Sequence, residues 1–336
     1  MRAAMGAGVS ELLDAAAAKN GGLLSFRDFS EIALFAPGCG YYARERERVG
    51  VAPGTDFYTA SSLGGEVFGG LVARAARTLL ERSGADPREF TLVEIGSEPG
   101  QDLFAGAADA FAGTRRFRLG DAVEIPEKAV VFANELFDAQ PFHRLIFRDG
   151  AWRETGVFRS RESGEWIETL LPALSTDALR RFVARELPAE IDEGWRLDIA
   201  LDAETLLEKI LAGAWRGAIV FPDYGKTLAD CLDSFPEGTA RAYFRHAQTN
   251  ALTARPGEQD LTCHVFWERL EKTARERGFA DAGVLRQEAF FMKFALPETE
   301  RIVARGTPRE RARLIELIHP AKMGHAFRVL SGTRGL

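Results

Sequence analysis

VVFANELFDAQPFH, residues 130–143, runs from an apolar segment into a turn that carries an amide and two acids. The apolar run Ala129–Ala133 predicts a short buried strand, because strands buried in parallel sheets are almost continuously apolar. Open α/β sheets bind ligands just beyond the carboxyl ends of their strands. Asn134, Glu135 and Asp138 therefore stand where such a sheet would place its reacting groups. A capped strand end, with Asp138 in a turn, is the alternative explanation.

A second strand followed by a turn lies upstream, in TLVEIGSEPGQDLFAGAADAF, residues 91–111. The segment Thr91–Ile95 predicts another buried strand, and Gly96 and Gly100 predict the turn. From Asp102 onward the alanine-rich sequence predicts a helix. Glycines let a backbone approach a ligand closely, and the first N–H groups of a helix would point at it. The segment therefore predicts a ligand-binding turn at the same edge of the sheet.

The turn fits one class of cofactor better than another. A nicotinamide-binding fingerprint requires glycines at positions 96, 98 and 101, but Glu98 and Gln101 occupy the last two. Only Asp121, which lies near the usual spacing after the turn, favours that interpretation. An acid at the end of the strand followed by a glycine turn is closer to the adenosylmethionine site of class I methyltransferases.

Composition argues against several classes of function. The chain has 336 residues, 46% of them hydrophobic, which is enough for one large α/β domain with insertions or for two domains. Its net charge of -6 argues against a general binder of nucleic acid or of anionic membranes. The basic runs Arg44–Arg48 and Arg115–Arg118 are expected to lie on solvated faces.

The cysteine and hydropathy patterns predict a cytoplasmic protein. Cys39, Cys231 and Cys263 are far apart and odd in number, so they suggest neither a disulfide framework nor a metal cluster and fit a reducing compartment. No stretch approaches the roughly 20 apolar residues that span a bilayer. Residues 1–22 contain acids and lack a continuous hydrophobic segment, so we expect an amphipathic helix there rather than a secretory signal.

Patterns along the rest of the chain predict the order of its elements. Residues 10–35 predict two helices, with Ser10 and Ser25 as N-caps. The Asp149–Gly150 pair predicts a hairpin in a β-rich segment that follows Pro141. The other expected elements are a helix at residues 64–83, a helix at 202–213, a strand at 217–225 that ends in an acid and a glycine turn, a helix at 268–277, a strand at 282–296 and a long helix at 298–318.

Six segments resemble, in order, the MidA-like family of class I S-adenosylmethionine-dependent methyltransferases. The most specific is NELFDAQPFH, residues 134–143, and GTDFYTASSLGGEVFGGLVA, residues 54–73, is similar to the family segment that lines the cofactor pocket. The other four are SFRDFSEIALFAPGCGYYA (residues 25–43), FPDYG (221–225), PGEQDLTCHVFW (256–267) and LIHPAKMGHAFRVL (317–330). The family includes an arginine methyltransferase that serves as a mitochondrial complex I assembly factor.

The resemblance implies an α/β fold with a class I methyltransferase-like (Rossmann-like), mostly parallel sheet, N-terminal helices and a β-rich insertion. We expect an N-terminal helical region with the cofactor-lining loop at residues 1–90, and a methyltransferase-like α/β domain at 91–336 with the insertion at about 142–200. The implied cofactor is S-adenosylmethionine. The implied methyl acceptor is an arginine on a partner protein, with a subunit of a respiratory complex as one candidate. Neither a nucleic acid nor a membrane is expected as a partner.

The resemblance also implies which residues bind the cofactor. They are Tyr58, Thr59, Glu94, Gly96 and Gly100. The first two would line one wall of the pocket, the next two would shape the glycine turn, and Gly100 would open the helix that follows.

The candidates for catalysis lie in the most specific segment. Carboxylates can orient a guanidinium bidentately and stabilise its charge during methyl transfer. Glu135 and Asp138 are the candidates for this role, and Asn134 would orient the pocket. Asp260 and His264 could join the site, or could instead cap or satisfy a buried strand.

The chain departs from the family pattern at the cofactor turn. The family sequence has the form Glu-x-Gly-x-Gly-x-Gly, but Glu98 stands where the middle glycine belongs. Its side chain would crowd the cofactor and its charge would repel the methionyl carboxylate. The segment between Gly100 and Val130 is also short, so we expect one strand and one helix to be missing. Asp121 is the best-placed acid to bind the ribose or the adenine amino group, with a solvated turn as the alternative.

Three functions are compatible with the sequence. The first is an active protein methyltransferase. The second is a degenerate homologue that keeps the fold and binds a partner without chemistry, which Glu98 and the short segment favour. The third is a nicotinamide-dependent oxidoreductase, which Asp121 alone favours. Architecture does not separate the first two, because a fold does not determine a function.

Overall fold

The computed structural model describes residues 8–44, 56, 60–98, 100 and 102–336. The chain forms two compact units, each assembled from three stretches of sequence. The first unit comprises Met1–Arg46, Phe137–Thr205 and Lys226–Val265, and the second comprises Glu47–Leu136, Leu206–Gly225 and Phe266–Leu336. The units therefore interleave along the chain. The sequence prediction places a boundary at residue 90 and an insertion at about 142–200.

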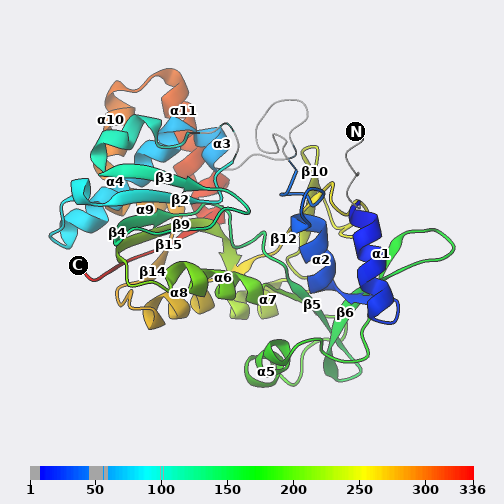
Figure 1. Ribbon diagram of the computed structural model, residues 1–336. Coiled ribbons are helices and arrows are strands. Elements are labelled where there is room, and N and C mark those ends of the chain that lie inside the picture. The colour runs from blue at the N-terminus through cyan, green and yellow to red at the C-terminus, as the bar shows by residue number, and fades with distance from the viewer. Residues whose placement is uncertain (1–7, 45–55, 57–59, 99, 101) are drawn as a thin grey trace, which may run out of the picture. The chain divides into compact units, whose positions relative to one another are not determined.

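A mixed sheet forms the centre of the second unit (Figure 1). Its strands lie in the order β14 (Gly283–Arg286), β15 (Phe327–Arg334), β9 (Arg216–Lys226), β4 (Lys128–Phe132), β2 (Thr91–Ile95) and β3 (Gly113–Phe117). β2 is parallel to both β3 and β4, and β4 is parallel to β9. β15 runs antiparallel to its neighbours β9 and β14. The predicted α/β class with a mostly parallel sheet is confirmed.

The two strands predicted from apolar runs are direct neighbours. Val93 of β2 pairs with Val131 of β4, which pairs in turn with Ile219 of β9. All three side chains are fully buried, as expected of strands that are covered on both faces. Because side chains alternate along a strand, Val130 and Phe132 face the opposite side of the sheet from Val131. Both faces of β4 are therefore apolar.

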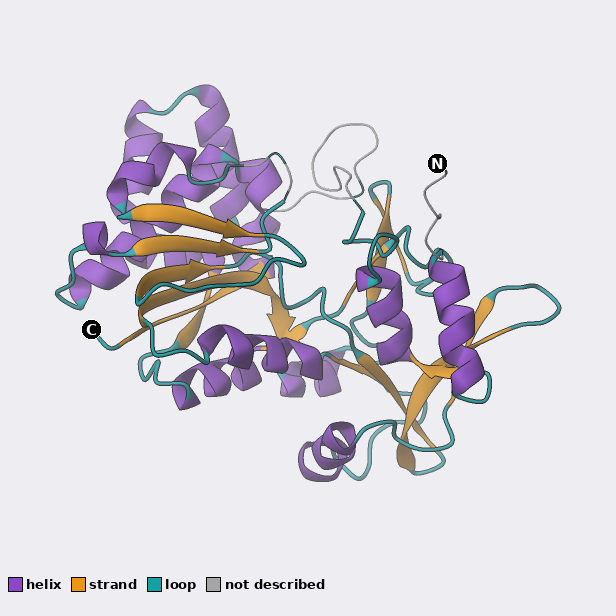
Figure 2. Ribbon diagram, in the orientation of Figure 1, coloured by secondary structure: helices purple, strands orange, loops and turns teal. Residues whose placement is uncertain are grey.

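Helices cover both faces of this sheet (Figure 1, Figure 2). The helices of the second unit are α3 (Ala60–Gly64), α4 (Glu66–Arg82), α8 (Trp267–Glu276), α9 (Gln287–Phe294), α10 (Leu296–Arg305) and α11 (Pro308–Ile318). The ring of Phe132 lies 5.2 Å from the ring of Phe104 and 6.2 Å from the ring of Phe68 on α4. The Phe68 ring also lies 6.0 Å from the ring of Phe291 on α9. Aromatic contacts thus tie α4 and α9 to one face of the sheet.

An antiparallel sheet forms the centre of the first unit. Its strands lie in the order β1 (Leu23–Ser25), β6 (Ala151–Arg159), β5 (His143–Arg148) and β8 (Arg196–Ile199), and β7 (Trp166–Leu170) pairs with β6. A smaller sheet has the order β11 (Ala247–Thr249), β10 (Arg241–Phe244) and β12 (Asp260–Thr262). The helices of this unit are α1 (Val9–Lys19), α2 (Phe26–Phe35), α5 (Asp177–Glu186) and α7 (Leu228–Ser234). The division between the units falls within α6 (Leu201–Leu211) and β13 (Val265–Phe266), and the last residue of β9, Lys226, is assigned to the first unit.

Local signals predict part of the first unit correctly. Asp149 and Gly150 join β5 to β6, with φ angles of 53° and 71°, as the tight hairpin turn requires. Ser25 caps α2 by accepting a backbone N–H, as predicted. The prediction that Ser10 caps the first helix is wrong. α1 already begins at Val9, so Ser10 lies inside the helix.

The C-terminal part of the chain corrects two predicted elements. The strand expected at residues 282–296 ends at Arg286 and α9 follows, because the phenylalanines beyond that point recur at helical spacing and are buried on one helix face. The helix expected at residues 298–318 is two helices, α10 and α11. The Thr307 hydroxyl accepts a backbone N–H of α11 and Pro308 occupies its first position, so a new helix begins there.

The lengthened strand β9 and its neighbour β15 were both predicted incorrectly from the sequence. The strand expected to end in Asp223 and a glycine turn instead continues to Lys226. Asp223 pairs with Arg328 of β15, and the antiparallel partner keeps this part of β9 extended. No pattern in the sequence predicted a strand at residues 327–334. β15 forms by pairing along its whole length with β9, which is remote in sequence.

The helix predicted after Asp102 is not formed. A short 3-10 segment, Ala105–Ala110, takes its place. α4 packs so closely here that a Cβ atom added at Gly69 would lie 1.8 Å from the Leu103 carbonyl oxygen. Residues 118–127, all of them described, join β3 to β4 without a helix, in line with the shortened segment.

The close approach of α4 to Leu103 predicts opposite effects at two adjacent glycines. Gly69→Ala should destabilise the protein by about 2 kcal/mol or more, since a methyl group would overlap backbone that cannot move away easily. Gly70→Ala is the matched control: its Cβ would meet only the flexible Glu298 carboxylate, 3.2 Å away. Alanine is favoured over glycine in helices by about 1 kcal/mol. In thermal melts Gly70→Ala should therefore melt at or above the wild-type temperature, and Gly69→Ala should melt below it. Equal melting temperatures of the two variants would contradict the close contact between Gly69 and Leu103.

Candidate functional site

Polar groups from three parallel strands meet at one edge of the second unit's sheet. Glu94 lies near the end of β2, and Asn134 and Glu135 follow the end of β4. The Glu135 backbone N–H donates to the Pro222 carbonyl oxygen at 3.0 Å, next to Asp223 in β9. The predicted common edge is thereby confirmed, because the carboxyl ends of these parallel strands coincide.

Glu135 is held in an unusual conformation. Its φ is 49°, a left-handed value that non-glycine residues adopt rarely and at some cost in free energy. The Oε1 atom of Glu135 accepts the Ala60 backbone N–H at 3.1 Å and the Asn134 side-chain amide at 2.9 Å. The carboxylate therefore anchors the first residue of α3 and orients Asn134. Among the described residues, the buried Oδ1 atom of Asn134 has no hydrogen-bond partner.

Asp138, predicted to act beside Glu135, belongs to the first unit. Its side chain is buried, and its carbonyl oxygen accepts the Cys263 backbone N–H at 3.0 Å. In the same unit the Tyr42 hydroxyl donates to Asp260 Oδ1 at 2.9 Å. Burial, with Asp260 and then Tyr41 and Asp138 adding to it, raises the pKa of Tyr42 well above its ordinary value. Tyr42 is therefore a neutral donor within a buried acidic group.

His264 and Asp260 both have structural partners in the first unit. Asp260 Oδ1 also accepts the Leu261 backbone N–H at 2.9 Å. The backbone N–H of His264 donates to the Thr239 hydroxyl at 3.2 Å. Burial, with the cationic side chains of Lys226 and Arg241 adding to it, lowers the pKa of His264 to about 4, so the ring is neutral at pH 7.

The glycine turn after β2 is anchored to β3. The backbone N–H groups of Gly96 and Ser97 both donate to the Phe117 carbonyl oxygen, at 2.9 and 3.1 Å. Gly96 and Gly100 have φ angles of 81° and 75°, which favour glycine. A Cβ atom added at Gly100 would meet nothing within 4 Å, so the turn borders open space.

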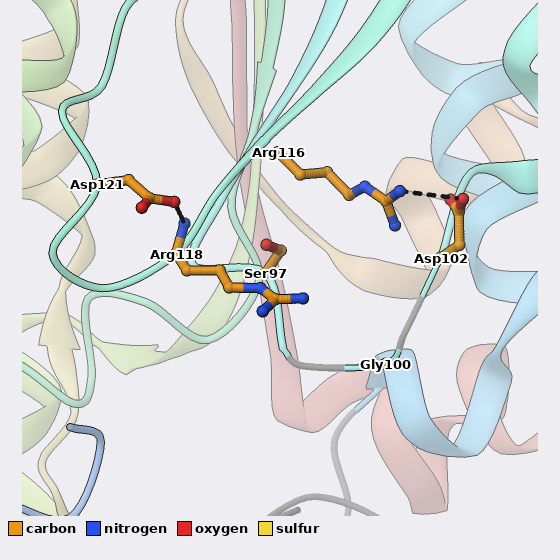
Figure 3. A pocket seen from close by; sticks show the side chains of 6 residues that line it. All are labelled: Ser97, Gly100, Asp102, Arg116, Arg118 and Asp121. Carbon is orange, nitrogen blue, oxygen red and sulfur yellow. Dashed lines mark hydrogen bonds and ion pairs between the residues drawn. The ribbon is translucent and has the colours of Figure 1, made fainter. Parts of the chain in front are cut away.

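That space is a cavity of about 590 Å³ (Figure 3). It is lined by Ser97, Gly100, Asp102, Arg116, Arg118 and Asp121. Its volume lies within the roughly 300–1,000 Å³ typical of small-molecule sites. The structure thus brings together Gly100 and Asp121, which the sequence analysis placed at the cofactor site. Glu94 and Gly96, also predicted to bind the cofactor, are not among the residues that line it. Tyr58 and Thr59 lie outside the described residues.

Sequence reasoning missed the two arginines of this cavity. Arg115, Arg116 and Arg118 are exposed, as expected, but the sequence did not indicate that Arg116 and Arg118 also line the cavity. The signal was present in the alternation of β3: residues two apart project to the same side of a strand, so both arginines share the side that borders the glycine turn. Detecting it required knowing that β3 pairs with β2.

Glu94 lies beside this cavity with an unusual protonation state. Burial raises the pKa of Glu94 to about 7, an effect that Arg116 opposes and Asp102 reinforces. Its buried Oε2 atom has no hydrogen-bond partner among the described residues. A buried acceptor without a partner suits a ligand that brings a cation or a donor. The residues at this turn therefore fit a cofactor with a positively charged amino-acid portion.

The sheet order and the glycine turn define a class of protein. Parallel strands followed by an antiparallel strand next to β9, with the turn after β2, are the arrangement of a class I methyltransferase fold. Residues 101–285 match the model of the family described as "Putative S-adenosyl-L-methionine-dependent methyltransferase". The match covers more than half of the chain, and the chain belongs to this MidA-like family, whose cofactor is S-adenosylmethionine.

Two curated proteins are similar to the chain. It is 26% identical over 217 residues to the mitochondrial protein arginine methyltransferase NDUFAF7 of Danio rerio, covering 62% of this chain and 48% of the relative. It is 27% identical over 239 residues to the mitochondrial protein arginine methyltransferase NDUFAF7 homolog of Drosophila melanogaster, covering 66% and 51%. The chain spans about half the length of these relatives.

Two solved structures from Burkholderia thailandensis share the fold. One, a crystal structure with S-adenosylhomocysteine bound, has a TM-score of 0.82 at 24% identity and covers 97% of this chain and 92% of its own. The other, a native crystal structure, has a TM-score of 0.79 at 24% identity, with coverages of 97% and 91%. These similarities support the class I fold over almost the whole chain.

Two kinds of feature do not occur in the described part of the chain. No group of three or more metal-ligating side chains occurs among the described residues. No helix in the same residues is long and apolar enough to cross a membrane.

The raised pKa of Glu94 predicts how stability depends on pH. The folded protein holds the Glu94 proton more tightly than the unfolded chain, whose value is near 4.5, so this group's stabilising contribution falls as pH rises from about 4.5 to about 7. Glu94→Gln removes that loss. The variant should gain melting temperature relative to the wild type between pH 4.5 and 7, by an amount equivalent to at most about 3 kcal/mol. Parallel melting curves across this range would show that Glu94 ionises normally.

Proposed function

We propose that this chain transfers the methyl group of S-adenosylmethionine to an arginine side chain of a partner protein. The observation that carries the proposal is a glycine-turn cavity at the carboxyl edge of a sheet, within a chain of a methyltransferase family. The finer assignment to arginine is supported by the names of the two curated relatives, both protein arginine methyltransferases. A subunit of a respiratory complex is the partner class we favour, and a cytoplasmic location remains a prediction.

In the proposed reaction, the main role of the protein is to position the cofactor and the methyl acceptor. The cofactor supplies a methyl group on a sulfonium, which is transferred by in-line displacement to an acceptor nitrogen. Glu135 is our candidate for orienting the acceptor guanidinium, because a carboxylate pairs with it bidentately. The hydrogen bonds that Glu135 Oε1 receives from Ala60 and Asn134 hold the carboxylate in one orientation. Asp138 remains a predicted second carboxylate.

A second function is favoured by one observation. Glu98 stands in the cofactor turn where the family pattern has a glycine. A protein whose turn disfavours the cofactor would keep the fold and act by binding a partner. The family match leaves the third alternative, a nicotinamide-dependent oxidoreductase, without support.

Glu98→Gly separates the first two functions. If Glu98 weakens cofactor binding, the variant should bind S-adenosylhomocysteine about tenfold more tightly, because a side chain and a negative charge near the ligand carboxylate are removed. Isothermal titration calorimetry of the wild type and the variant measures both affinities. An unchanged or weaker affinity in a folded variant would show that the turn accommodates Glu98.

Glu135→Gln tests the proposed catalytic role. The amide keeps the shape and can still accept the Ala60 N–H, but it loses the charge that would pair with a guanidinium. Transfer of labelled methyl groups to proteins of a cell extract should slow by about tenfold or more. The matched control is Glu127→Gln, which removes an exposed acid just before β4, at the opposite end of that strand.

Thermal melts accompany both variants. Glu127→Gln should keep both its melting temperature and its rate of transfer. If Glu135→Gln melts far below the wild type, Glu135 is a structural anchor for α3 and the catalytic assignment is wrong. If the wild type labels no protein and binds no S-adenosylhomocysteine, yet retains a partner from the extract, the binding function replaces the enzyme.

A further inference from the structure

One cationic side chain of the glycine-turn cavity, that of Arg118, has no partner among the described residues. Arg118 follows the end of β3, and its guanidinium extends toward Ser97 and Gly100 (Figure 3). No hydrogen bond or ion pair links this guanidinium to any other described residue. Arg118 is exposed, so water satisfies the five N–H donors of its guanidinium until a ligand brings acceptor atoms of its own.

The other charged groups of the cavity already have partners. Arg116 pairs with Asp102, with a guanidinium nitrogen 3.3 Å from a carboxylate oxygen. Asp121 Oδ2 accepts the backbone N–H of Arg118 at 2.7 Å. Figure 3 shows that the Asp121 carboxylate lies at the backbone of Arg118, whereas the guanidinium points away from it. The charge that remains for a ligand at this end of the cavity is therefore the positive charge of Arg118.

We propose that Arg118 is a specificity-determining residue that binds an anionic group, a carboxylate or a phosphate, of the ligand held in the glycine-turn cavity. The inference rests on the proposed function in one respect, that a cofactor occupies this cavity. Planar, bidentate pairing is what a guanidinium offers to both groups. Asp121, the acid expected to bind ribose or adenine, accepts the Arg118 backbone N–H and also lines the cavity. Arg118 would add a hydrogen-bond donor for the ligand at this end of β3.

Three probes distinguish the sources of the anionic group. S-adenosylhomocysteine carries an amino-acid carboxylate and no phosphate. 5′-Methylthioadenosine shares its adenosine and sulfur but lacks that carboxylate. Adenosine 2′,5′-bisphosphate carries phosphates and no amino acid. Affinities are measured by calorimetry on the full chain at two salt concentrations, since a charge pair weakens as salt rises.

The variants are Arg118→Gln, Arg118→Lys and the matched control Arg115→Gln. Arg115 lies on β3, projects to the side of the strand opposite to Arg116, and does not line the cavity. Arg118→Gln should weaken binding of the anionic probe by about 10- to 100-fold, the effect of losing hydrogen bonds to a charged group. The affinity of Arg118→Lys should lie between those of the wild type and Arg118→Gln, because lysine keeps the charge but loses the planar, bidentate donor geometry of the guanidinium. Arg115→Gln should change affinity less than about twofold.

The outcomes separate the sources. If Arg118→Gln weakens S-adenosylhomocysteine but leaves 5′-methylthioadenosine unchanged, the anion is the amino-acid carboxylate. If it weakens the bisphosphate alone, the anion is a phosphate. Should the wild type bind the bisphosphate through Arg118 but not S-adenosylhomocysteine, the methyltransferase proposal fails while the anion site stands.

Several results would overturn the inference. One is that the Arg118→Gln variant binds every probe with wild-type affinity. Another is that its affinity for neutral and for anionic probes falls equally. Arg115→Gln could cause the same loss, which would indicate a diffuse charge effect. A wild type that binds none of the three probes would remove both this inference and the proposed function. Melting curves of all variants show whether a loss of binding reflects unfolding.

Discussion

The parallel pairing of β2, β4 and β9 is the constraint on which the site depends. Val93, Val131 and Ile219 are consecutive cross-strand partners and are fully buried. Both faces of β4 are buried, so a slip of one residue would exchange the side chains on the two faces, and each would then have to repack against helices shaped for the other. The same register brings the strand ends level, which places Glu94, Glu135 and the glycine turn at one edge of the sheet. The placement of the candidate site residues is therefore a consequence of hydrophobic packing.

Strain and capping are combined at Glu135. Its left-handed φ is stabilised by a backbone hydrogen bond to β9 and by the contact of its carboxylate with the start of α3. A residue that holds its neighbours in place is already oriented before any ligand arrives. The buried Oδ1 atom of Asn134 and the buried Oε2 atom of Glu94 add two acceptors at the same edge. The site thus carries a preformed set of acceptors that suits cationic ligands.

Sequence patterns predicted the central strands well and the flanking elements less well. Thr91–Ile95 and the run ending near Ala133 were recognisable because buried parallel strands are apolar throughout. β15 was missed, since its pairing with β9 joins segments about a hundred residues apart. The helix expected after Asp102 failed because alanine content reports local propensity, while the close approach of Gly69 on α4 limits the space.

The sequence by itself determined the α/β class, the glycine turn, the polar strand ends and the family, because each depends on residues that are close together along the chain. Only the tertiary structure decided which charges share a cavity. Arg118 faces the glycine turn because β3 pairs with β2, and Asp138 is packed with Tyr42 and Asp260 in the first unit. Local patterns carry periodicity and turn chemistry, whereas the electrostatic character of a site depends on segments that folding brings together from distant parts of the chain.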